Sequence, residues 1–230
     1  MKKSFHYSYL ALCLVHLIAE QLDVEWLVLA TKPLLITILL IGAWDILKKP
    51  LTKPSRFLLF GLFFSIGGDS LLMLVERGPR LPLFFLLGLG SFLIAHIWYL
   101  LSFRQMAQSK EGYLSAGKWW RAWPLILFWA GMLALLLPRL EVAMQVPVAL
   151  YATAIVTMAM SAMHLYGILP NRWWRMLMAG VLLFVFSDAV IAINKFVTVV
   201  PGARLLIMTT YLLGQYWIVE GAIGGVKEQD

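Results

Sequence analysis

Two aspartates, Asp69 and Asp188, lie within hydrophobic segments that are long enough to cross a lipid bilayer. A carboxylate in hydrocarbon is costly, so an acid at that depth is by default a candidate functional residue. Arg56 precedes Asp69 by 13 residues, and Arg175 precedes Asp188 by the same 13 residues. At a helical rise of ~1.5 Å per residue, both acids are expected ~20 Å from a basic rim, and therefore at one depth.

Two carboxyl groups at one depth suggest acid–base chemistry. Lys32 is expected in the same plane, but a single lysine leaves an excess of negative charge in a low dielectric. Burial and a like charge both favour the neutral form of a carboxyl, so we expect one of the two aspartates to keep its proton at neutral pH. General acid–base catalysis uses such a protonated and ionised pair. The structural alternative is that each acid pairs with Lys32 and only locks helices together.

Other polar side chains are candidates for binding a substrate or for setting the protonation of the aspartates. Tyr211 is expected in the plane of the acids, and Gln215 shares its helix face four residues later. Lys195 is expected at the outer rim, either to meet a phosphate or to extend into the interface. His96 is expected nearer the inner side, where a lone histidine is more often a helix contact. The candidates besides the two aspartates are Lys32, His96, Tyr151, Asn194, Lys195, Tyr211 and Gln215.

The composition indicates a polytopic membrane protein. Of 230 residues, 61% are hydrophobic and 13% are charged, which is less charge than a water-soluble domain carries. The net charge of +7 does not indicate nucleic-acid binding, because the basic residues are spread over short loops. The single cysteine, Cys13, excludes an intrachain disulfide and a cysteine-based metal cluster. The histidines lack metal-ligand spacing, and we expect neither a metal nor a cofactor.

The fold predicted from the sequence is all-α, a bundle of eight transmembrane helices in a single domain covering residues 1–230. Each predicted span is close to the ~20 residues that cross the hydrocarbon. The spans are 5–22, 25–47, 56–76, 81–103, 120–138, 143–166, 173–195 and 203–226. Small residues within them, among them Gly90, Gly180 and Gly214, are expected to let neighbouring helices approach closely.

Lysine and arginine accumulate on the cytoplasmic side of membrane proteins, so their distribution predicts an orientation. With the N-terminus inside, thirteen fall on the cytoplasmic side and five on the other. We therefore expect both termini in the cytoplasm, in a multi-pass protein of a bacterial inner membrane. Because no small-x-small cleavage site follows the basic start, we expect an uncleaved first span. The thirteen are Lys2, Lys3, Lys48, Lys49, Lys53, Arg56, Arg104, Lys110, Lys118, Arg121, Arg172, Arg175 and Lys227; the five are Arg77, Arg80, Arg139, Lys195 and Arg204.

Short stretches around these polar residues form an ordered set along the chain. They are Thr31-Lys32-Pro33; Ser65 to Asp69 with Met73; Gly88 to Phe92 through His96 and Tyr99; Gly180 to Asp188 with Asn194-Lys195-Phe196; and Thr210-Tyr211 with Gln215-Tyr216. Taken in this order, they resemble the YhhN family of membrane proteins, the group that includes the animal lysoplasmalogenases. The resemblance extends from the second span to the eighth, nearly the whole chain.

The resemblance implies an eight-helix membrane hydrolase with a lysophospholipid substrate. It would cleave the vinyl ether bond of lysoplasmalogens, or of a related lysolipid, to a fatty aldehyde and a glycerophospho-alcohol. Vinyl ethers hydrolyse by proton transfer to the β carbon and capture of the resulting cation by water, which requires an acid and a stabilising negative group. Asp69 and Asp188 are the candidates for these two roles, with Lys32 keeping the second one ionised.

Two other functions are compatible with intramembrane aspartates. An intramembrane aspartyl protease also uses two, but Ile66 replaces the first glycine of its Gly-x-Gly-Asp signature, and Ser187 replaces the tyrosine of its Tyr-Asp pair. A proton-coupled transporter would use Asp69, Asp188 and Lys32 as a relay. The sequence shows neither the inverted repeats nor the paired broken helices that many transporters have.

Overall fold

The computed structural model describes residues 3–47, 50–77, 82–108, 110–115 and 118–228, which form eight α-helices and no extended strands. Each predicted span corresponds to one helix, with ends that differ by a few residues. The fifth is the shortest, because short 3-10 turns at Trp119–Ala122 and Leu137–Arg139 flank it. The helices are α1 (Lys3–Gln21), α2 (Glu25–Ile46), α3 (Lys53–Arg77), α4 (Pro82–Ala107), α5 (Trp123–Leu136), α6 (Val142–His164), α7 (Asn171–Phe196) and α8 (Ala203–Lys227).

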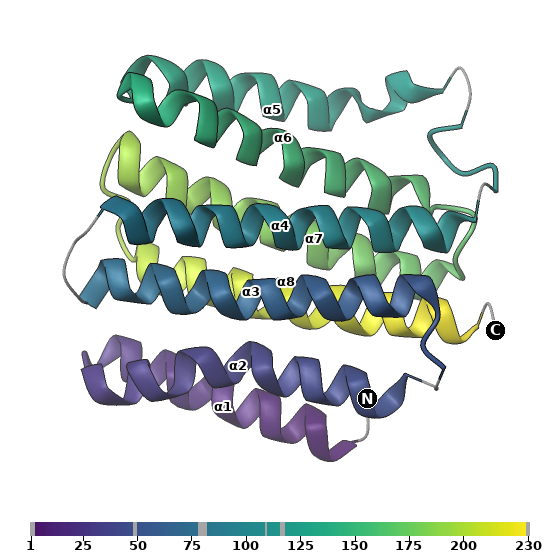
Figure 1. Cartoon of the computed structure of the whole chain (residues 1–230), viewed down its shortest axis with the longest axis horizontal. Helices are drawn as coiled ribbons and strands as arrows, with labels where there is room; N and C mark the ends of the chain where they lie inside the picture. Colours follow the sequence, from purple (N-terminus) through teal and green to yellow (C-terminus); the bar gives the residue numbers. More distant parts are fainter. Residues whose placement is uncertain (1–2, 48–49, 78–81, 109, 116–117, 229–230) are drawn as a thin grey trace.

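The helices lie side by side with nearly parallel axes and alternate in direction along the chain (Figure 1). Contacts connect α1, α2, α3, α4, α6, α7 and α8 in that order, and α8 returns to α1; α5 packs outside this ring on α6 and α7. The start of α1 and the end of α8 lie at one end of the bundle, which we call the proximal end. The α1–α2 turn and the start of α8 lie at the other, the distal end. Lys2, Lys48, Lys49, Arg80 and Leu81, which entered the predicted orientation and spans, lie outside the described residues.

Six helical segments are long and apolar enough to cross a membrane, namely those containing α2 to α7, among the residues that the structure describes. The predicted spans α1 and α8 do not meet this measure. For α8 the physical reason is its position, since fifteen of its residues are buried by neighbouring helices, Gln215 and Glu220 among them. A helix that is shielded from lipid in this way can carry polar and small residues.

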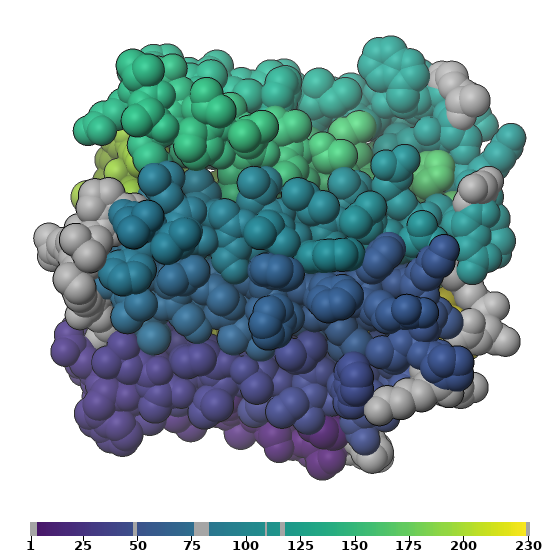
Figure 2. Space-filling model, in the orientation of Figure 1, coloured from purple at the N-terminus to yellow at the C-terminus, as the bar shows by residue number. Residues whose placement is uncertain are grey.

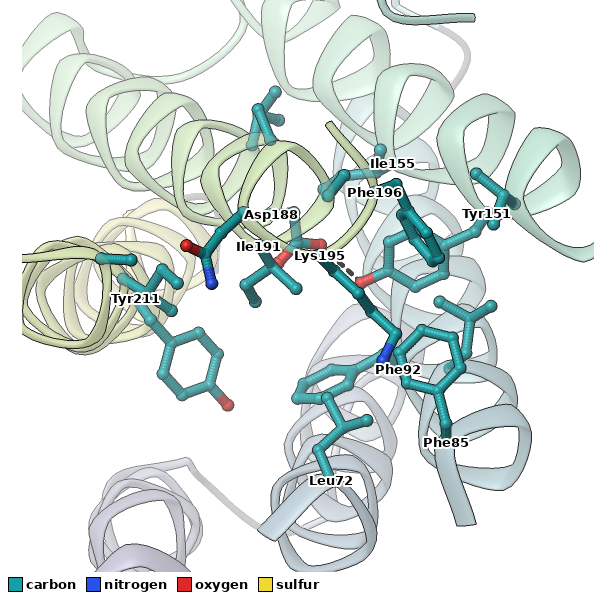
Figure 3. A pocket seen from close by; sticks show the side chains of 18 of the residues that line it. Leu72, Phe85, Phe92, Tyr151, Ile155, Asp188, Ile191, Lys195, Phe196 and Tyr211 are labelled. Atoms are coloured by element: carbon teal, nitrogen blue, oxygen red, sulfur yellow. Dashed lines mark hydrogen bonds between the residues drawn. The ribbon is translucent and has the colours of Figure 1, made fainter. Parts of the chain in front are cut away.

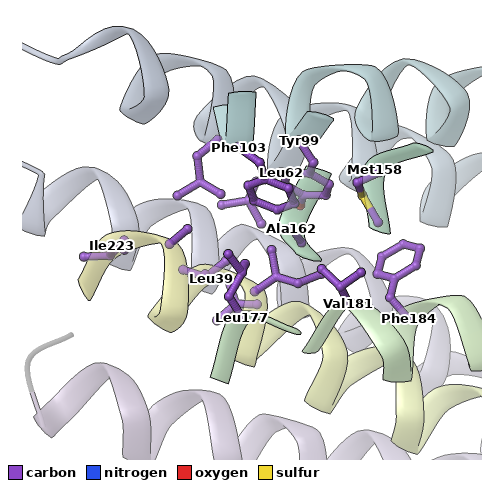
Figure 4. Packing of buried hydrophobic residues seen from close by; sticks show 14 of the residues in the cluster. Leu39, Leu62, Tyr99, Phe103, Met158, Ala162, Leu177, Val181, Phe184 and Ile223 are labelled. Carbon is purple, nitrogen blue, oxygen red and sulfur yellow. The ribbon is translucent and has the colours of Figure 1, made fainter. Parts of the chain in front are cut away.

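A large apolar core fills the space between α2, α3, α4, α6, α7 and α8. Figure 4 shows Leu62 and Tyr99 facing Met158 of α6 and Val181 and Phe184 of α7. Large apolar side chains also cover the outside of the bundle, where neighbouring helices pack without open gaps on the face shown in Figure 2. An apolar exterior around a polar-containing interior is what a lipid environment favours.

Two glycines set the distance between α7 and α8. A Cβ atom built on Gly180 would lie 2.6 Å from the backbone nitrogen of Ile218, and one on Gly214 would lie 3.0 Å from the carbonyl oxygen of Gly180. The two backbones are therefore in direct contact, as the small residues predicted. For Gly90 the same prediction is wrong, because nothing lies within 4 Å of the position its Cβ would take. Gly90 faces open space on α4.

The contact at Gly180 predicts a stability difference between two identical substitutions. Gly180→Ala should destabilise the folded protein by about 1–3 kcal/mol, because the added methyl group forces the backbones of α7 and α8 apart. Gly90→Ala is the matched control and should be neutral or slightly stabilising. Thermal unfolding in detergent measures both, and equal midpoints for the two variants would contradict the close α7–α8 packing.

Candidate active site

A cavity of about 550 Å³ lies inside the bundle, and residues of all eight helices line it. Seven of the nine polar residues singled out in the sequence lie in its wall: Lys32 of α2, Asp69 of α3, Tyr151 of α6, Asp188, Asn194 and Lys195 of α7, and Tyr211 of α8. Lys32, Asp69 and Tyr211 are nearly inaccessible to solvent. The structure thus brings both carboxyl groups to one cavity from helices that are distant in sequence.

The carboxyl group of Asp188 accepts a hydrogen bond from a tyrosine of the neighbouring helix. The hydroxyl of Tyr151 donates to Oδ2 of Asp188 at 2.5 Å, and Figure 3 shows this bond inside the cavity. His96 of α4 packs edge-on against the ring of Tyr151 at 5.1 Å between ring centroids. The sides of the phenol are therefore held by α4 while its hydroxyl is directed at α7.

Asp69 has an equivalent partner on a different helix. The hydroxyl of Tyr211 donates to Oδ2 of Asp69 at 2.6 Å. Behind it, the side-chain amide of Gln215 donates to the hydroxyl of Ser65 at 3.1 Å and accepts a hydrogen bond from the hydroxyl of Tyr99 at 2.8 Å. This buried network connects α3, α4 and α8. A phenol oriented in this way holds its carboxyl in one rotamer, which is the preorganisation that a reactive site needs.

The distal end of the cavity is charged. Lys195 lines it, with its ammonium 4.3 Å from the centroid of the Phe85 ring. Arg204 lines it as well and donates to Asp23 at 2.7 Å, with Glu20 at 3.7 Å. Both cations are exposed, so they are accessible to a charged group at the mouth of the cavity. The distal mouth therefore presents charge of both signs.

The remaining predicted residues have different surroundings. Asn194 lines the cavity, and its Oδ1 accepts a hydrogen bond from the backbone nitrogen of Val200, which holds the α7–α8 connection. His96 and Gln215 are fully buried and lie outside the residues that line the cavity. They contact Tyr151 and Tyr211, respectively, and so lie one layer behind the two phenols. No three His, Cys, Asp or Glu side chains in the described part of the chain are grouped to hold a metal ion.

Sequence reasoning missed one whole wall of the cavity. Phe128 and Trp129 of α5, with Ile155 and Val156 of α6, line it with apolar side chains. An apolar residue in a span has the same sequence signature whether it faces lipid or a cavity, so no sequence signal distinguishes these positions. The acids at the α1–α2 turn did carry a signal, since Glu20, Asp23 and Glu25 are closely grouped in a chain with only 12 acidic residues.

Comparison with known proteins identifies the family. The model of the YhhN family matches residues 27–222, which include every helix except α1 in whole or large part. The chain belongs to the YhhN family. The family resemblance found in the sequence is thereby confirmed. No solved structure matches the chain significantly.

Several curated relatives of this YhhN-family protein are named as enzymes. Bovine lysoplasmalogenase TMEM86A is 34% identical over 178 residues, which cover 75% of this chain and 68% of the bovine protein. Human lysoplasmalogenase TMEM86A is 33% identical over 179 residues, with the same 75% and 68% coverage. A lysoplasmalogenase of Mycobacterium tuberculosis is 27% identical over 182 residues, which cover 79% of this chain and 66% of that protein. These similarities support the expectation of an enzyme of the ether hydrolase class.

The network behind Asp69 predicts a double-mutant effect. Gln215→Leu should destabilise the protein by about 1–3 kcal/mol, because the buried hydroxyl of Tyr99 loses its acceptor. Combining it with Tyr99→Phe removes both partners and should recover part of that loss. Thermal unfolding of the two single variants and the double variant measures the coupling. Strictly additive losses would show that the hydrogen bond between these residues does not stabilise the fold.

Proposed function

We propose that this YhhN-family protein is a membrane-embedded hydrolase that cleaves the vinyl ether bond of lysoplasmalogens or of a related lysolipid. The products are a fatty aldehyde and a glycerophospho-alcohol. One observation carries the proposal: Asp69 and Asp188 line a single cavity that is charged at one end and apolar along another wall. The names of the relatives, lysoplasmalogenase in mammals and mycobacteria, support the same reaction.

The cavity has the polarity of a single-chain lipid. Lys195 and Arg204 at its distal mouth suit a phosphate-containing headgroup, and the α5–α6 wall suits a hydrocarbon chain. Asp188 lies seven residues before Lys195 on α7, so at ~1.5 Å per residue it lies ~10 Å inward from the charged mouth. Figure 3 shows both side chains at the cavity. The vinyl ether of a lysoplasmalogen occupies the same relative position, between the headgroup and the hydrocarbon chain. A lysolipid bound in this direction therefore presents its reactive bond to the acids.

The chemistry requires two carboxyl groups in opposite protonation states. The protonated one transfers its proton to the β carbon of the vinyl ether, which leaves an oxocarbenium ion. The ionised one stabilises this cation and accepts a proton from the water that adds to it. The hemiacetal formed then breaks its bond to the glycerol oxygen and gives an aldehyde and an alcohol. One water is consumed, and no proton is gained or lost overall.

Neighbouring groups fit these roles. The ammonium of Lys32 lines the same cavity and would favour the ionised form of one carboxyl. The hydroxyls of Tyr151 and Tyr211 each donate to one aspartate and direct it into the cavity.

The proposed topology has all eight helices crossing the membrane as one domain. Both termini are cytoplasmic, and the distal mouth faces the periplasmic leaflet of a bacterial inner membrane. Burial of α8 among its neighbours supports its inclusion despite its polar residues. In this orientation the charged mouth lies near the headgroup layer, and the aspartates lie beneath it, at the depth of the sn-1 linkage of a lysolipid.

Removal of either carboxyl should abolish the reaction. Asp69→Asn and Asp188→Asn should each lower the release of aldehyde from a lysoplasmalogen by at least about a hundredfold, because general acid–base groups contribute ~10²–10⁴-fold. Asp45→Asn, on the exposed side of α2, is the matched control and should retain wild-type activity. Gel filtration and thermal unfolding verify that each variant is folded. Retained aldehyde release in either cavity variant would contradict the two-acid mechanism.

The position of the transferred proton provides an independent test. In D₂O, the released aldehyde should carry one deuterium at the carbon next to the carbonyl, since the enzyme protonates the β carbon of the vinyl ether. The saturated alkyl analogue lacks the carbon–carbon double bond that accepts this proton and should remain intact. Mass spectrometry of the aldehyde measures the label. An unlabelled aldehyde would exclude carbon protonation, and substrate-dependent proton flux without any aldehyde would favour a transporter.

A further inference from the structure

One wall of the cavity is apolar and continues past the aspartates. On α5 it is formed by Phe128, Trp129 and Met132, and on α6 by Ala152, Ile155 and Val156. The indole nitrogen of Trp129 donates to the hydroxyl of Thr153 at 3.1 Å, so its polar atom has a partner within the wall. We call this region the α5–α6 arm. Its surface offers no charged group to a ligand.

The arm extends away from the charged mouth. The helix α6 begins at the distal end, and Val156 follows Tyr151 by five residues. At ~1.5 Å per residue the arm therefore reaches about 7 Å beyond the phenol that contacts Asp188, toward the proximal end. Past Val156 the interior is closed, because Met158 and Ala159 are fully buried in the core. The helix α5 begins at the proximal end, and Phe128 is its first residue that lines the cavity. The arm thus has an inner end, formed by Val156 on α6 and Phe128 on α5.

We propose that the α5–α6 arm binds the hydrocarbon chain of the lysolipid and that Val156 and Phe128 at its inner end limit the length of chain that is cleaved. The inference rests on the proposed function. It adds the residues that select substrates by the length of the hydrocarbon chain. With the headgroup at Lys195 and Arg204 and the vinyl ether at the aspartates, the arm is the part of the cavity that the chain enters.

Selection in the arm depends on fit. A bilayer is as apolar as the arm, so a chain gains little from the hydrophobic effect when it moves from lipid into the protein. A chain that is too long must bend or displace packed side chains, and overpacking of this kind is unfavourable. Filling the inner end should therefore act on long chains and leave short ones unaffected. Enlarging the inner end should increase the activity on long chains.

The test compares two lysoplasmalogens that share one headgroup and differ in the length of the vinyl ether chain. Val156→Phe should lower the ratio of kcat/KM for the long chain to that for the short chain by about tenfold or more. The loss of activity should be larger for the long chain than for the short one. Val146→Phe is the matched control, because Val146 lies on the same helix but is 66% exposed on the outside of the bundle, and its ratio should not change.

A second variant keeps the inference testable if Val156→Phe does not fold. Phe128→Ala removes bulk from the same end and should shift the ratio toward the longer chain. A ratio in Phe128→Ala equal to that of the wild type would overturn the assignment of the arm.

A binding measurement separates this inference from the proposed function. Saturated alkyl lysolipids of the two lengths should stabilise wild type against thermal unfolding, and Val156→Phe should lose the stabilisation by the long one selectively. If the wild type releases aldehyde but Val156→Phe is stabilised equally by both chain lengths, only the assignment of the arm is rejected. Chain-selective binding without aldehyde release from either lysoplasmalogen rejects the reaction and retains the arm.

Discussion

Two carboxyl groups lie inside an apolar bundle, and each must be hydrogen-bonded there because an unsatisfied buried polar group is costly. Asp69 and Asp188 each accept a hydrogen bond from a tyrosine on another helix, Tyr211 and Tyr151 respectively. In a low dielectric such bonds are stronger than in water, and an unmet polar group is more costly. The same bonds connect α3 to α8 and α6 to α7. The hydroxyl groups that orient the two carboxyl groups therefore also join these pairs of helices.

The position of α8 follows from this constraint. Tyr211 and Gln215 must reach the interior, so α8 has to lie among the other helices instead of at the lipid surface. Gly180 and Gly214 make this possible, because their missing side chains bring the backbones of α7 and α8 into contact. With lipid excluded, α8 tolerates polar residues that lower its overall hydropathy. One face of α8 therefore contacts the backbone of α7, and another face carries the hydrogen bonds of Tyr211 and Gln215.

The proposed substrate reaches the site from the surrounding membrane. In the proposed binding mode, the charged distal mouth, the pair of acids and the apolar arm receive the headgroup, the reactive bond and the chain of a lysolipid, respectively. A soluble enzyme would have to extract such a substrate from the bilayer. Here the lipid need only exchange one apolar environment for another, so binding energy is available for orientation.

The sequence by itself determined the helices and the two central acids. Apolar runs of bilayer length predict spans, and a carboxyl group within one is unusual enough to identify Asp69 and Asp188 without a structure. Only the tertiary structure decided that Tyr151 contacts Asp188, that Gln215 lies behind the cavity, that Gly90 faces open space, and that α5 and α6 form an apolar wall. The physical reason is that hydropathy reports whether a residue tolerates an apolar environment, and in a membrane the lipid, the core and an apolar cavity are equally suitable. Which of the three a helix face meets is set by rotation and packing against helices far away in the chain.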